Sequence, residues 1–284
     1  YYAYEVKNAV KVNEVFLKDA CLQYYVLKNK IQLADFFLVT VNNTYVFNGK
    51  RDVKQLFKKR SIKHEAENNL NYFDVKVAQA LLTLDNNAIP NVEVGENCFK
   101  PYVCDFYQTC WKGKVDSDSI FNLPYISKKQ AIEFYKDGIQ KIEDLPNEIN
   151  LPKKALIIKE SLTNKSVYLD ELKLNEFLNT IDFNFCALDI EVLSTSIPDI
   201  VNTKPFEQIP FLFCVYDNVT ENYFYTNHKS DERNELLNAL IAYTKNYKSV
   251  LVFDATMEIS VINKLIELFP NMAFELTKKK KKIV

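Results

Sequence analysis

Glycine is scarce in this chain, with only four among 284 residues. A phosphate-binding loop needs several glycines close together, so P-loop and Rossmann nucleotide binding are excluded. No apolar run reaches the ~18–20 residues that a membrane helix needs. The formal net charge is -1, so the chain lacks the overall basic field of a non-specific nucleic-acid coat. A nuclease is not excluded, because its active site itself holds carboxylates.

An initiator Met is also missing. The chain opens with Tyr1-Tyr2-Ala3-Tyr4, in what reads as the middle of a strand, and ends after a lysine run at 278–282. We therefore expect a fragment truncated at both ends. Its length leaves room for about two domains, and a hydrophobic content of 48% is enough for a sizeable core.

Three of the six cysteines, Cys98, Cys104 and Cys110, lie close together, with five residues between neighbours. Thiolates this crowded are typical of a soft metal centre. The spacing is too wide for a zinc knuckle, and an iron–sulfur cluster usually takes four cysteines, so one ligand is missing. The alternative is three reduced, buried thiols. The remaining cysteines, Cys21, Cys186 and Cys214, lie singly among apolar residues and are expected to be buried.

The first segment predicts a strand over 1–10 and a helix over 12–30. A hairpin of 36–41 with 44–48 and a second helix over 65–84 follow. Glu5 and Lys7 are two residues apart, so both side chains project from the same strand face. Glu5 could ligate a divalent ion while Lys7 positions water and phosphate. The alternative is an exposed ion pair on an ordinary strand.

The middle segment predicts a helix from Ser127 to Gly138 and a second short helix over 139–145. Two short helices joined at a glycine resemble a helix-hairpin-helix, which grips the DNA backbone. A plain helical linker is the alternative. Two further stretches, 156–162 and 169–178, continue as helix or connection.

The last segment predicts a strand over 183–191, buried on both faces, and further strands over 211–216, 221–225 and 249–253. Helices are predicted over 230–247 and 259–269. Asp189 and Glu191 share a face at the end of the first strand, and Glu258 lies near the start of the last helix. These acids could hold two Mg²⁺ or Mn²⁺ ions that activate water against a phosphodiester. The alternative is a capped strand end with acids facing solvent.

The order of motifs in the first segment resembles the RecB-like branch of the PD-(D/E)XK nucleases, in particular the CRISPR-associated type with an iron–sulfur cluster. That resemblance implies catalytic roles for Glu5, Lys7 and Gln23 and a substrate contact for Tyr25. It also implies that Cys98, Cys104 and Cys110 hold a 4Fe–4S cluster whose fourth cysteine lies upstream. The family's first metal-binding Asp would also lie upstream. Trp111 is expected to shield the cluster from solvent.

The last segment resembles the DEDD 3′–5′ exonucleases of the RNase H-like fold. Asp189 and Glu191 match their first motif, and Glu258 takes the position of the acid in their second motif, where Asp is usual. Asp254 stands where an Asn is common and is expected to contact substrate. The third motif would follow residue 284.

Across its length the chain resembles an uncharacterised bacterial family that fuses these pieces in this order. We therefore expect an α/β protein with a partial PD-(D/E)XK nuclease core and iron–sulfur tail, a helical linker and an RNase H-like domain, over 1–115, 116–180 and 181–284. The predicted function is metal-dependent hydrolysis of nucleic acid, DNA in the first instance, by a cytoplasmic protein with no membrane partner, in DNA processing, repair or defence. The alternatives are a catalytically decayed nucleic-acid-binding module and a zinc-stapled interaction scaffold.

Overall fold

The computed structural model of the chain describes residues 1–86, 88–146, 148–227 and 230–284. The chain has a mixed α/β architecture, which confirms the predicted class at that level. It folds as two compact units, one formed by Ala78–Leu174 and the other by Tyr1–Val77 together with Asn175–Val284. The cysteine group therefore belongs to the same unit as most of the predicted linker. Within the described ranges, no helix has the length and apolar character to cross a membrane.

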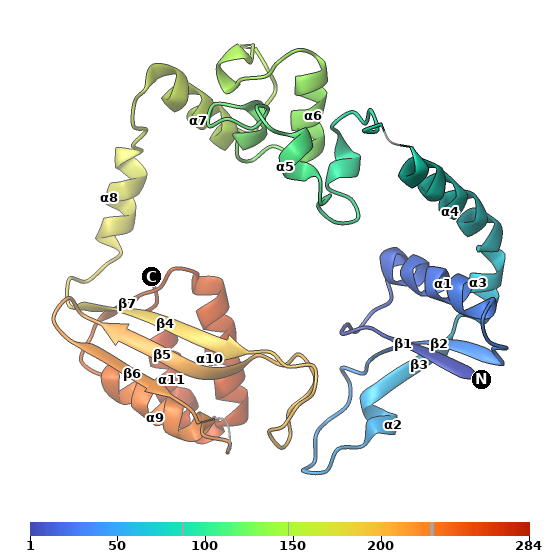
Figure 1. The fold of residues 1–284 in the computed structure, drawn as a ribbon. Coiled ribbons are helices and arrows are strands. Elements are labelled where there is room, and N and C mark those ends of the chain that lie inside the picture. The colour runs from blue at the N-terminus through green and yellow to red at the C-terminus, as the bar shows by residue number, and fades with distance from the viewer. Residues whose placement is uncertain (87, 147, 228–229) are drawn as a thin grey trace. The chain divides into compact units, whose positions relative to one another are not determined.

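A three-stranded sheet organises the first segment (Figure 1). Its strands are β1 (Tyr2–Val6), β2 (Asp35–Val41) and β3 (Phe57–Ser61), in the order β1-β2-β3. β1 runs parallel to β2, and β3 runs antiparallel to it. A parallel pair needs a crossover connection, and here that connection is a helix.

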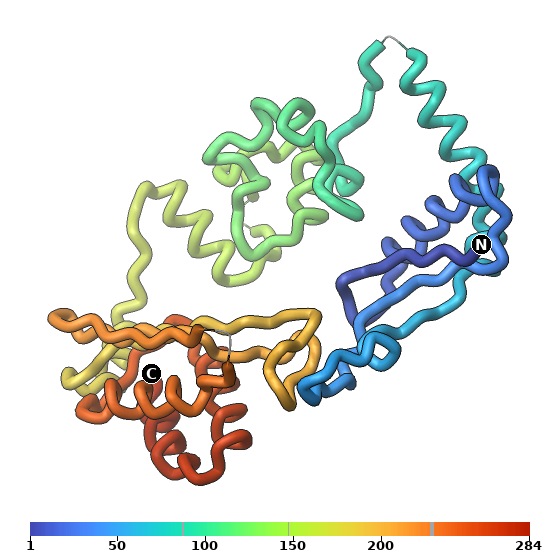
Figure 2. Tube along the Cα trace, turned by 60° about the horizontal axis from the view of Figure 1, so that its bottom comes forward, coloured from blue at the N-terminus to red at the C-terminus, as the bar shows by residue number. Residues whose placement is uncertain are grey.

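The crossover helix α1 (Glu14–Lys28) covers one face of the sheet (Figures 1 and 2). It begins where the Asn13 side chain accepts a hydrogen bond of 2.8 Å from the Phe16 backbone N–H, which satisfies an unpaired donor of the first turn. Its inner side packs against β2, and the shared core includes Ala20, Cys21, Tyr24, Phe36 and Leu38. The expected core position of Cys21 is thus confirmed.

The predicted hairpin of 36–41 with 44–48 is wrong, because β2 pairs with β3 instead. Residues 44–48 form no strand. The Asn42 side chain accepts hydrogen bonds from the backbone N–H and the hydroxyl of Thr44, so the chain turns where the partner strand would begin.

The segment after this turn packs through its aromatic side chains. Tyr45 and Phe47 are buried with Leu56 of the short helix α2 (Val53–Leu56). β3 follows directly, with the sequence Phe-Lys-Lys-Arg-Ser. Its charged residues carry no strand signal, so only pairing with β2 reveals it.

The predicted helix over 65–84 is divided into α3 (Lys63–Asn68) and α4 (Leu70–Asp85). The break falls at Asn69, whose side-chain amide donates a 2.8 Å hydrogen bond to the carbonyl of Glu65. Asparagine competes in this way with the backbone hydrogen bonds of a helix, which explains the interruption.

The unit Ala78–Leu174 has its own small cores, formed mainly by short helices. Its helices after α4 are the 3-10 helices η1 (Glu96–Cys98), η2 (Ile120–Asn122) and η3 (Ile142–Asp144), together with α5 (Tyr107–Cys110), α6 (Lys128–Lys136), α7 (Lys153–Asn164) and the start of α8 (Glu171–Asn179). The predicted start of α6 is confirmed, because Ser127 accepts a 3.1 Å hydrogen bond from the Gln130 backbone. Gly138 follows α6 with φ of 89°.

The prediction of a second helix, which would complete a helix-hairpin-helix, is wrong. After Gly138, residues 139–145 form the single 3-10 turn η3, and Lys141 makes a bridge with Ser119. Ile142 and Leu145 are buried in the local core, so this stretch packs as a connection. The linker alternative describes it better.

A four-stranded sheet organises the last segment, with the order β6-β5-β4-β7. Its strands are β4 (Phe185–Leu193), β5 (Ile209–Tyr216), β6 (Glu221–Tyr225) and β7 (Ser249–Leu251). β4 is antiparallel to β5 and parallel to β7, so the carboxyl ends of β4 and β7 point to the same edge.

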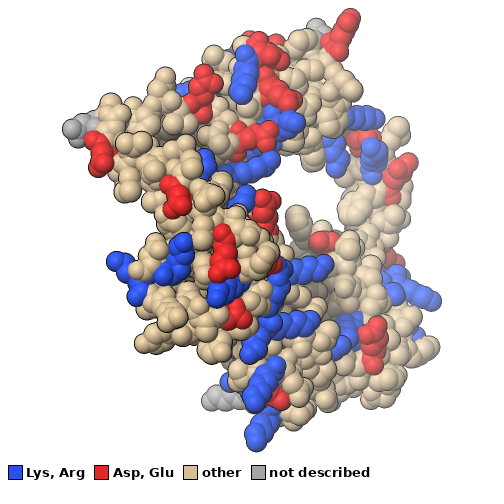
Figure 3. Space-filling view, turned by 90° about the vertical axis from the view of Figure 1, so that its right-hand side faces the viewer, with Lys and Arg blue, Asp and Glu red and all other residues tan. Residues whose placement is uncertain are grey.

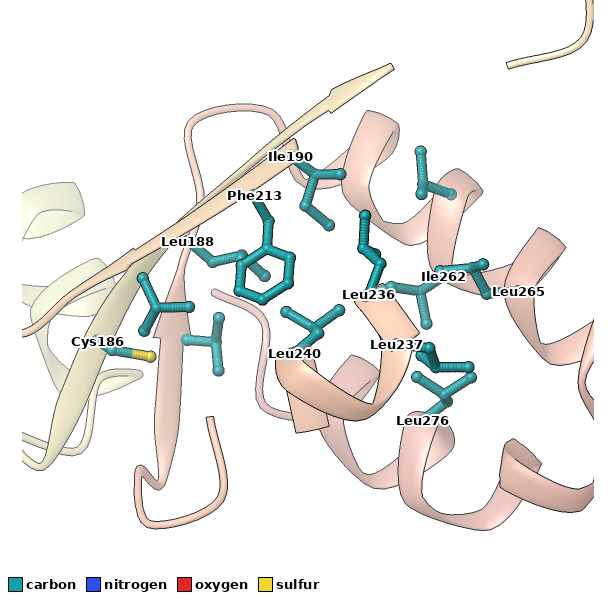
Figure 4. Close-up of a cluster of buried hydrophobic side chains, with 13 residues drawn as sticks. Cys186, Leu188, Ile190, Phe213, Leu236, Leu237, Leu240, Ile262, Leu265 and Leu276 are labelled. Carbon is teal, nitrogen blue, oxygen red and sulfur yellow. The ribbon is translucent and has the colours of Figure 1, made fainter. Parts of the chain in front are cut away.

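Helices α9 (Arg233–Tyr243), α10 (Ala255–Leu268) and α11 (Ala273–Lys280) pack on one face of this sheet, and the 3-10 helix η4 (Pro270–Met272) joins the last two. Figure 4 shows the core between them, where Phe213 of β5 lies among leucines of α9 and residues of β4.

The prediction that β4 is buried on both faces is wrong. Cys186, Leu188 and Ile190 point into the core, whereas Ala187, Asp189 and Glu191 are exposed. The helices that supply the core pack against only one side of β4, so its side chains alternate between core and open face.

Candidate functional site

The structure brings Glu5 and Lys7 together. Both side chains lie on the face of β1 that α1 covers, and only about a fifth of each is exposed. Lys7 Nζ lies 2.7 Å from Glu5 Oε1, and it also forms an ion pair with Asp19 of α1. The predicted shared face is therefore present.

Gln23 joins the same group from the next turn of α1. Its Nε2 donates a 3.3 Å hydrogen bond to Asp19 Oδ2, the oxygen that also accepts from Lys7. Burial acts to lower the pKa of Lys7, but the hydrogen bonds to Asp19 and Glu5 outweigh it and raise that pKa above its ordinary value. Lys7 is therefore a cation at neutral pH and is unsuited to act as a general base.

Tyr25 lies outside this group. Its hydroxyl donates a 2.8 Å hydrogen bond to Asp74 of α4, and its ring lies 6.0 Å from that of Phe73. Gln23 and Tyr25 are two positions apart in a helix, which places them on different sides of α1. In this structure Tyr25 helps to join α1 to α4.

Asp189 and Glu191 lie together on the open face of β4, as their spacing predicts. Both are exposed, and the described residues offer neither a hydrogen bond nor an ion pair to either carboxylate. Asp189 lies opposite Cys214 of β5. The two acids are thus free to accept a cation from solvent.

Asp254 and Glu258 approach from the start of α10, just after β7. Asp254 caps the helix by accepting a 3.0 Å hydrogen bond from the Thr256 backbone. Glu258 is only 4% exposed, and its buried Oε2 has no hydrogen-bond partner. Burial raises the pKa of Glu258, and the negative charges of Asp254 and Asp189 add to this effect.

The buried oxygen of Glu258 is the feature of these acids that a divalent cation would satisfy. A buried carboxylate oxygen without a partner is costly, and a cation would satisfy it. No three His, Cys, Asp or Glu side chains in the described ranges lie close enough to form a ready-made metal cage. Mg²⁺ is commonly held by one or two carboxylates with water or phosphate as the other ligands, so a smaller set is sufficient.

The three clustered cysteines are not arranged as a ligand set. Cys98 is buried beside Trp111, whereas Cys104 and Cys110 are exposed. The described residues contain no group of three thiols that could hold a metal as they stand. The iron–sulfur cluster therefore remains a prediction, and no mechanism is drawn through it.

Trp111 has a structural role that does not require a cluster. It is fully buried, and its ring centroid lies 4.5 Å from that of Phe121 and 5.3 Å from those of Phe99 and Tyr107. Aromatic contacts of this kind stabilise a small core by packing alone. These contacts give the cysteine region a small core of its own.

The thiols should differ sharply in reactivity. At pH 8, iodoacetamide should label Cys104 and Cys110 well before Cys186, because burial raises the pKa of Cys186 to about 11 and leaves roughly one thiol in a thousand ionised. Peptide mass spectrometry measures the order. Anaerobic incubation with iron and sulfide should slow the labelling of Cys104 and Cys110 if they ligate a cluster. Unchanged labelling would contradict the cluster.

Sequence reasoning missed Asp19 as a site residue. A signal was present, because Asp19 precedes Gln23 by four residues and so lies on the same face of α1. Nothing in the local sequence shows that this face meets Lys7, since that contact depends on the crossover from β1 to β2.

Comparison with known proteins covers only the last segment. Residues 186–284 match a family described as a domain of unknown function (DUF2779). No curated protein and no solved structure matches the chain. The match begins in β4, and the matched residues include Asp189, Glu191, Asp254 and Glu258.

Proposed function

We propose that the chain is a metal-dependent nuclease that hydrolyses phosphodiesters at the acidic group of β4 and α10. The observation that carries this proposal is the buried, unpartnered carboxylate oxygen of Glu258 beside the charges of Asp254 and Asp189. A stability role does not explain it, because an isolated buried carboxylate opposes folding. A role in binding a cation explains why this carboxylate is buried without a partner.

In this proposal Asp189 and Glu258 hold Mg²⁺ or Mn²⁺. Such an ion lowers the pKa of a bound water and stabilises charge on a phosphate oxygen. Glu191, two residues further along the open face of β4, would position the ion or its water. Asp254 anchors the start of α10 through its cap and so fixes where Glu258 enters the group.

The cluster on β1 and α1 is proposed as a second phosphate-handling centre. Lys7 would neutralise a phosphate charge, and Gln23 would orient Asp19. Lys7 already pairs with both Glu5 and Asp19, so substrate or a cation must compete for these contacts. That pairing favours a second candidate function, a nucleic-acid-binding module without hydrolysis at this centre.

The test is degradation of end-labelled DNA by the full chain in Mn²⁺. Asp189→Asn should lower the rate about 100-fold or more, because several kcal/mol of transition-state stabilisation depend on the ion. Asp199→Asn is the matched control, since Asp199 is exposed in the loop after β4. Glu5→Gln in the same assay measures the contribution of the first centre.

The two candidate functions predict different results. A Mn²⁺-dependent rate that falls in Asp189→Asn but not in Asp199→Asn supports the nuclease. Binding of DNA without Mn²⁺-dependent hydrolysis would support the binding module and overturn the proposal. An equal rate in the parent chain, Asp189→Asn and Asp199→Asn would locate hydrolysis outside the acidic group.

A further inference from the structure

We propose that β3 and the segment before it form a binding surface for the phosphate backbone of a nucleic acid. Residues 50–63 contain seven Lys and Arg against one acid, in a chain whose net charge is -1. Six of these cations are exposed, and we call them the basic edge: Lys50, Arg51, Lys54, Lys58, Lys59 and Arg60. This local excess of positive charge is the electrostatic signature of polyanion binding.

The one acid in this stretch does not neutralise the basic edge. Asp52 caps α2 by accepting hydrogen bonds from the backbone N–H groups of Lys54 and Gln55, at 2.9 and 3.2 Å. Only Oδ1 takes part in these bonds, and Asp52 forms no ion pair with a Lys or Arg of the described ranges, so its charge offsets just one of the seven positive charges. Arg60 pairs with Glu65, and Lys59 lies 5.3 Å from the Phe37 ring centroid. The described residues give the other four cations no charged partner.

The basic edge is also held in place. Leu56 is buried between α2 and β3, and Tyr45 packs beside it. The Tyr45 hydroxyl accepts a 3.2 Å hydrogen bond from the Asp52 backbone, which ties the start of α2 to this small core. The backbone that carries these cations is therefore preformed, which lowers the ordering cost of association.

Strand register places part of the basic edge on the same sheet face as the first centre. Lys58 lies opposite Thr40 and Arg60 opposite Leu38, while Leu38 lies opposite Glu5 on its other side. Partners across a ladder project from the same face, so Lys58 and Arg60 share the face of Glu5. Neighbouring strands are about 4.8 Å apart, which puts β3 roughly 10 Å from β1.

Figure 3 shows one face of the chain, on which Lys and Arg side chains gather over the lower part of the view. The choice of a nucleic acid among polyanions rests on the proposed function. A phosphodiester chain bound along the basic edge would lie at the edge of the same three-stranded sheet that carries Glu5. An anionic membrane or an acidic protein gains nothing from that proximity.

The lysine run 278–282 is the denser cationic sequence, but the structure uses much of it internally. Lys279 is only 7% exposed, and Lys280 donates a hydrogen bond to Asn263. Lys282 donates to the carbonyl of Tyr247. The two exposed members are Lys278, which pairs with Glu275 at 3.4 Å, and Lys281, and together they serve as a charge-matched control.

The experiment measures binding without hydrolysis. Fluorescence anisotropy of labelled single-stranded DNA, duplex DNA and single-stranded RNA is recorded with the full chain in EDTA across a series of salt concentrations. Each lost phosphate contact lowers the slope of log K against log salt by about 0.7 for single strands and about 0.9 for duplex. Lys54→Gln/Lys58→Gln should therefore lower the slope by about 1.4 or about 1.8, with weaker binding to every sequence.

Two further variants make the result decisive. Lys50→Gln/Arg51→Gln should lower the slope in the same way, whereas Lys278→Gln/Lys281→Gln should leave it unchanged. Equal effects at both places, no effect at the basic edge, or no binding by the parent chain would overturn the inference. Preferential binding to vesicles with anionic lipid would also overturn it.

Failure of the proposed function gives a different pattern. A slope that falls only in the basic-edge variants, with no Mn²⁺-dependent hydrolysis, leaves the binding surface intact and removes the nuclease. Mn²⁺-dependent hydrolysis together with a salt slope that is unchanged in the basic-edge variants supports the nuclease and removes the binding surface.

Discussion

Replacing Glu258 by glutamine is expected to stabilise the metal-free chain while removing its response to Mn²⁺. The buried Oε2 of Glu258 has no partner, and a buried polar group left in this state costs about 1–3 kcal/mol. Glutamine keeps the shape and removes the charge. The glutamine amide is still a buried polar group without a partner, so only the cost of the charge is removed, and the free energy of unfolding above the folded-state pKa should rise by about 1 kcal/mol. Denaturation followed by far-ultraviolet circular dichroism measures this change.

The gain should depend on pH in one direction. The pKa of Glu258 is raised in the folded state, so the folded protein holds its proton longer than the unfolded chain does. Below the unfolded-state pKa of about 4.3 both states are protonated and the gain vanishes. As pH rises through the folded pKa, the parent loses stability and the gain grows to its full value.

Mn²⁺ should stabilise the parent chain more than it stabilises the Glu258→Gln variant. At an ion concentration about 100 times Kd, binding stabilises the parent by about 2.7 kcal/mol, whereas the variant should gain little. Electron paramagnetic resonance of free Mn²⁺ gives the binding directly. Glu267→Gln is the matched control, because Glu267 is an exposed glutamate on the same helix. If Glu258→Gln destabilises the metal-free chain, or retains full Mn²⁺ binding, the cation site is wrong.

Replacing Phe213 by alanine is expected to destabilise the last segment by about 3–5 kcal/mol. Phe213 is fully buried in the core (Figure 4). Its ring centroid lies 6.3 Å from that of Phe224 and 6.0 Å from that of Tyr243. Its removal leaves a cavity between β5 and α9 that the rigid sheet cannot close. The loss is a large part of the stability of a typical domain.

Phe253 provides the control for this prediction. It is fully exposed just after β7, so Phe253→Ala should change the free energy of unfolding by no more than about 0.5 kcal/mol. Circular dichroism reports the unfolding of helices and strands in the whole chain. Trp111 fluorescence reports only the unit Ala78–Leu174, because Trp111 is the single tryptophan of the chain. Similar losses in the two variants would place Phe213 outside the core.

Several elements follow from local sequence alone. The strand over 221–225 is predicted residue for residue, and the start of α6 follows from the hydroxyl of Ser127. In both cases the determining interactions lie within a few residues. The shared face of Glu5 and Lys7 is equally local, because a strand alternates its side chains whatever it packs against.

Other elements depend on contacts that no local pattern records. β3 consists mainly of cations and becomes a strand only because the edge of β2 is free to pair with it. Its exposed, charged character suits an edge strand, which must resist pairing with other chains. The break at Asn69 and the missing second strand of the predicted hairpin have the same origin, since asparagine side chains replace backbone partners there.

The sequence by itself determined which side chains share a face: Glu5 with Lys7, Asp19 with Gln23, and Asp189 with Glu191. Strand and helix periodicity is a property of the backbone, so it needs no knowledge of partners. Only the tertiary structure decided which faces meet. The crossover from β1 to β2 joins Lys7 to Asp19, and the packing of α10 buries Glu258 without a partner. The charge state of a side chain depends on its burial and on its pairing with distant residues. Burial and pairing are set by tertiary packing, which the spacing of residues in the sequence does not specify.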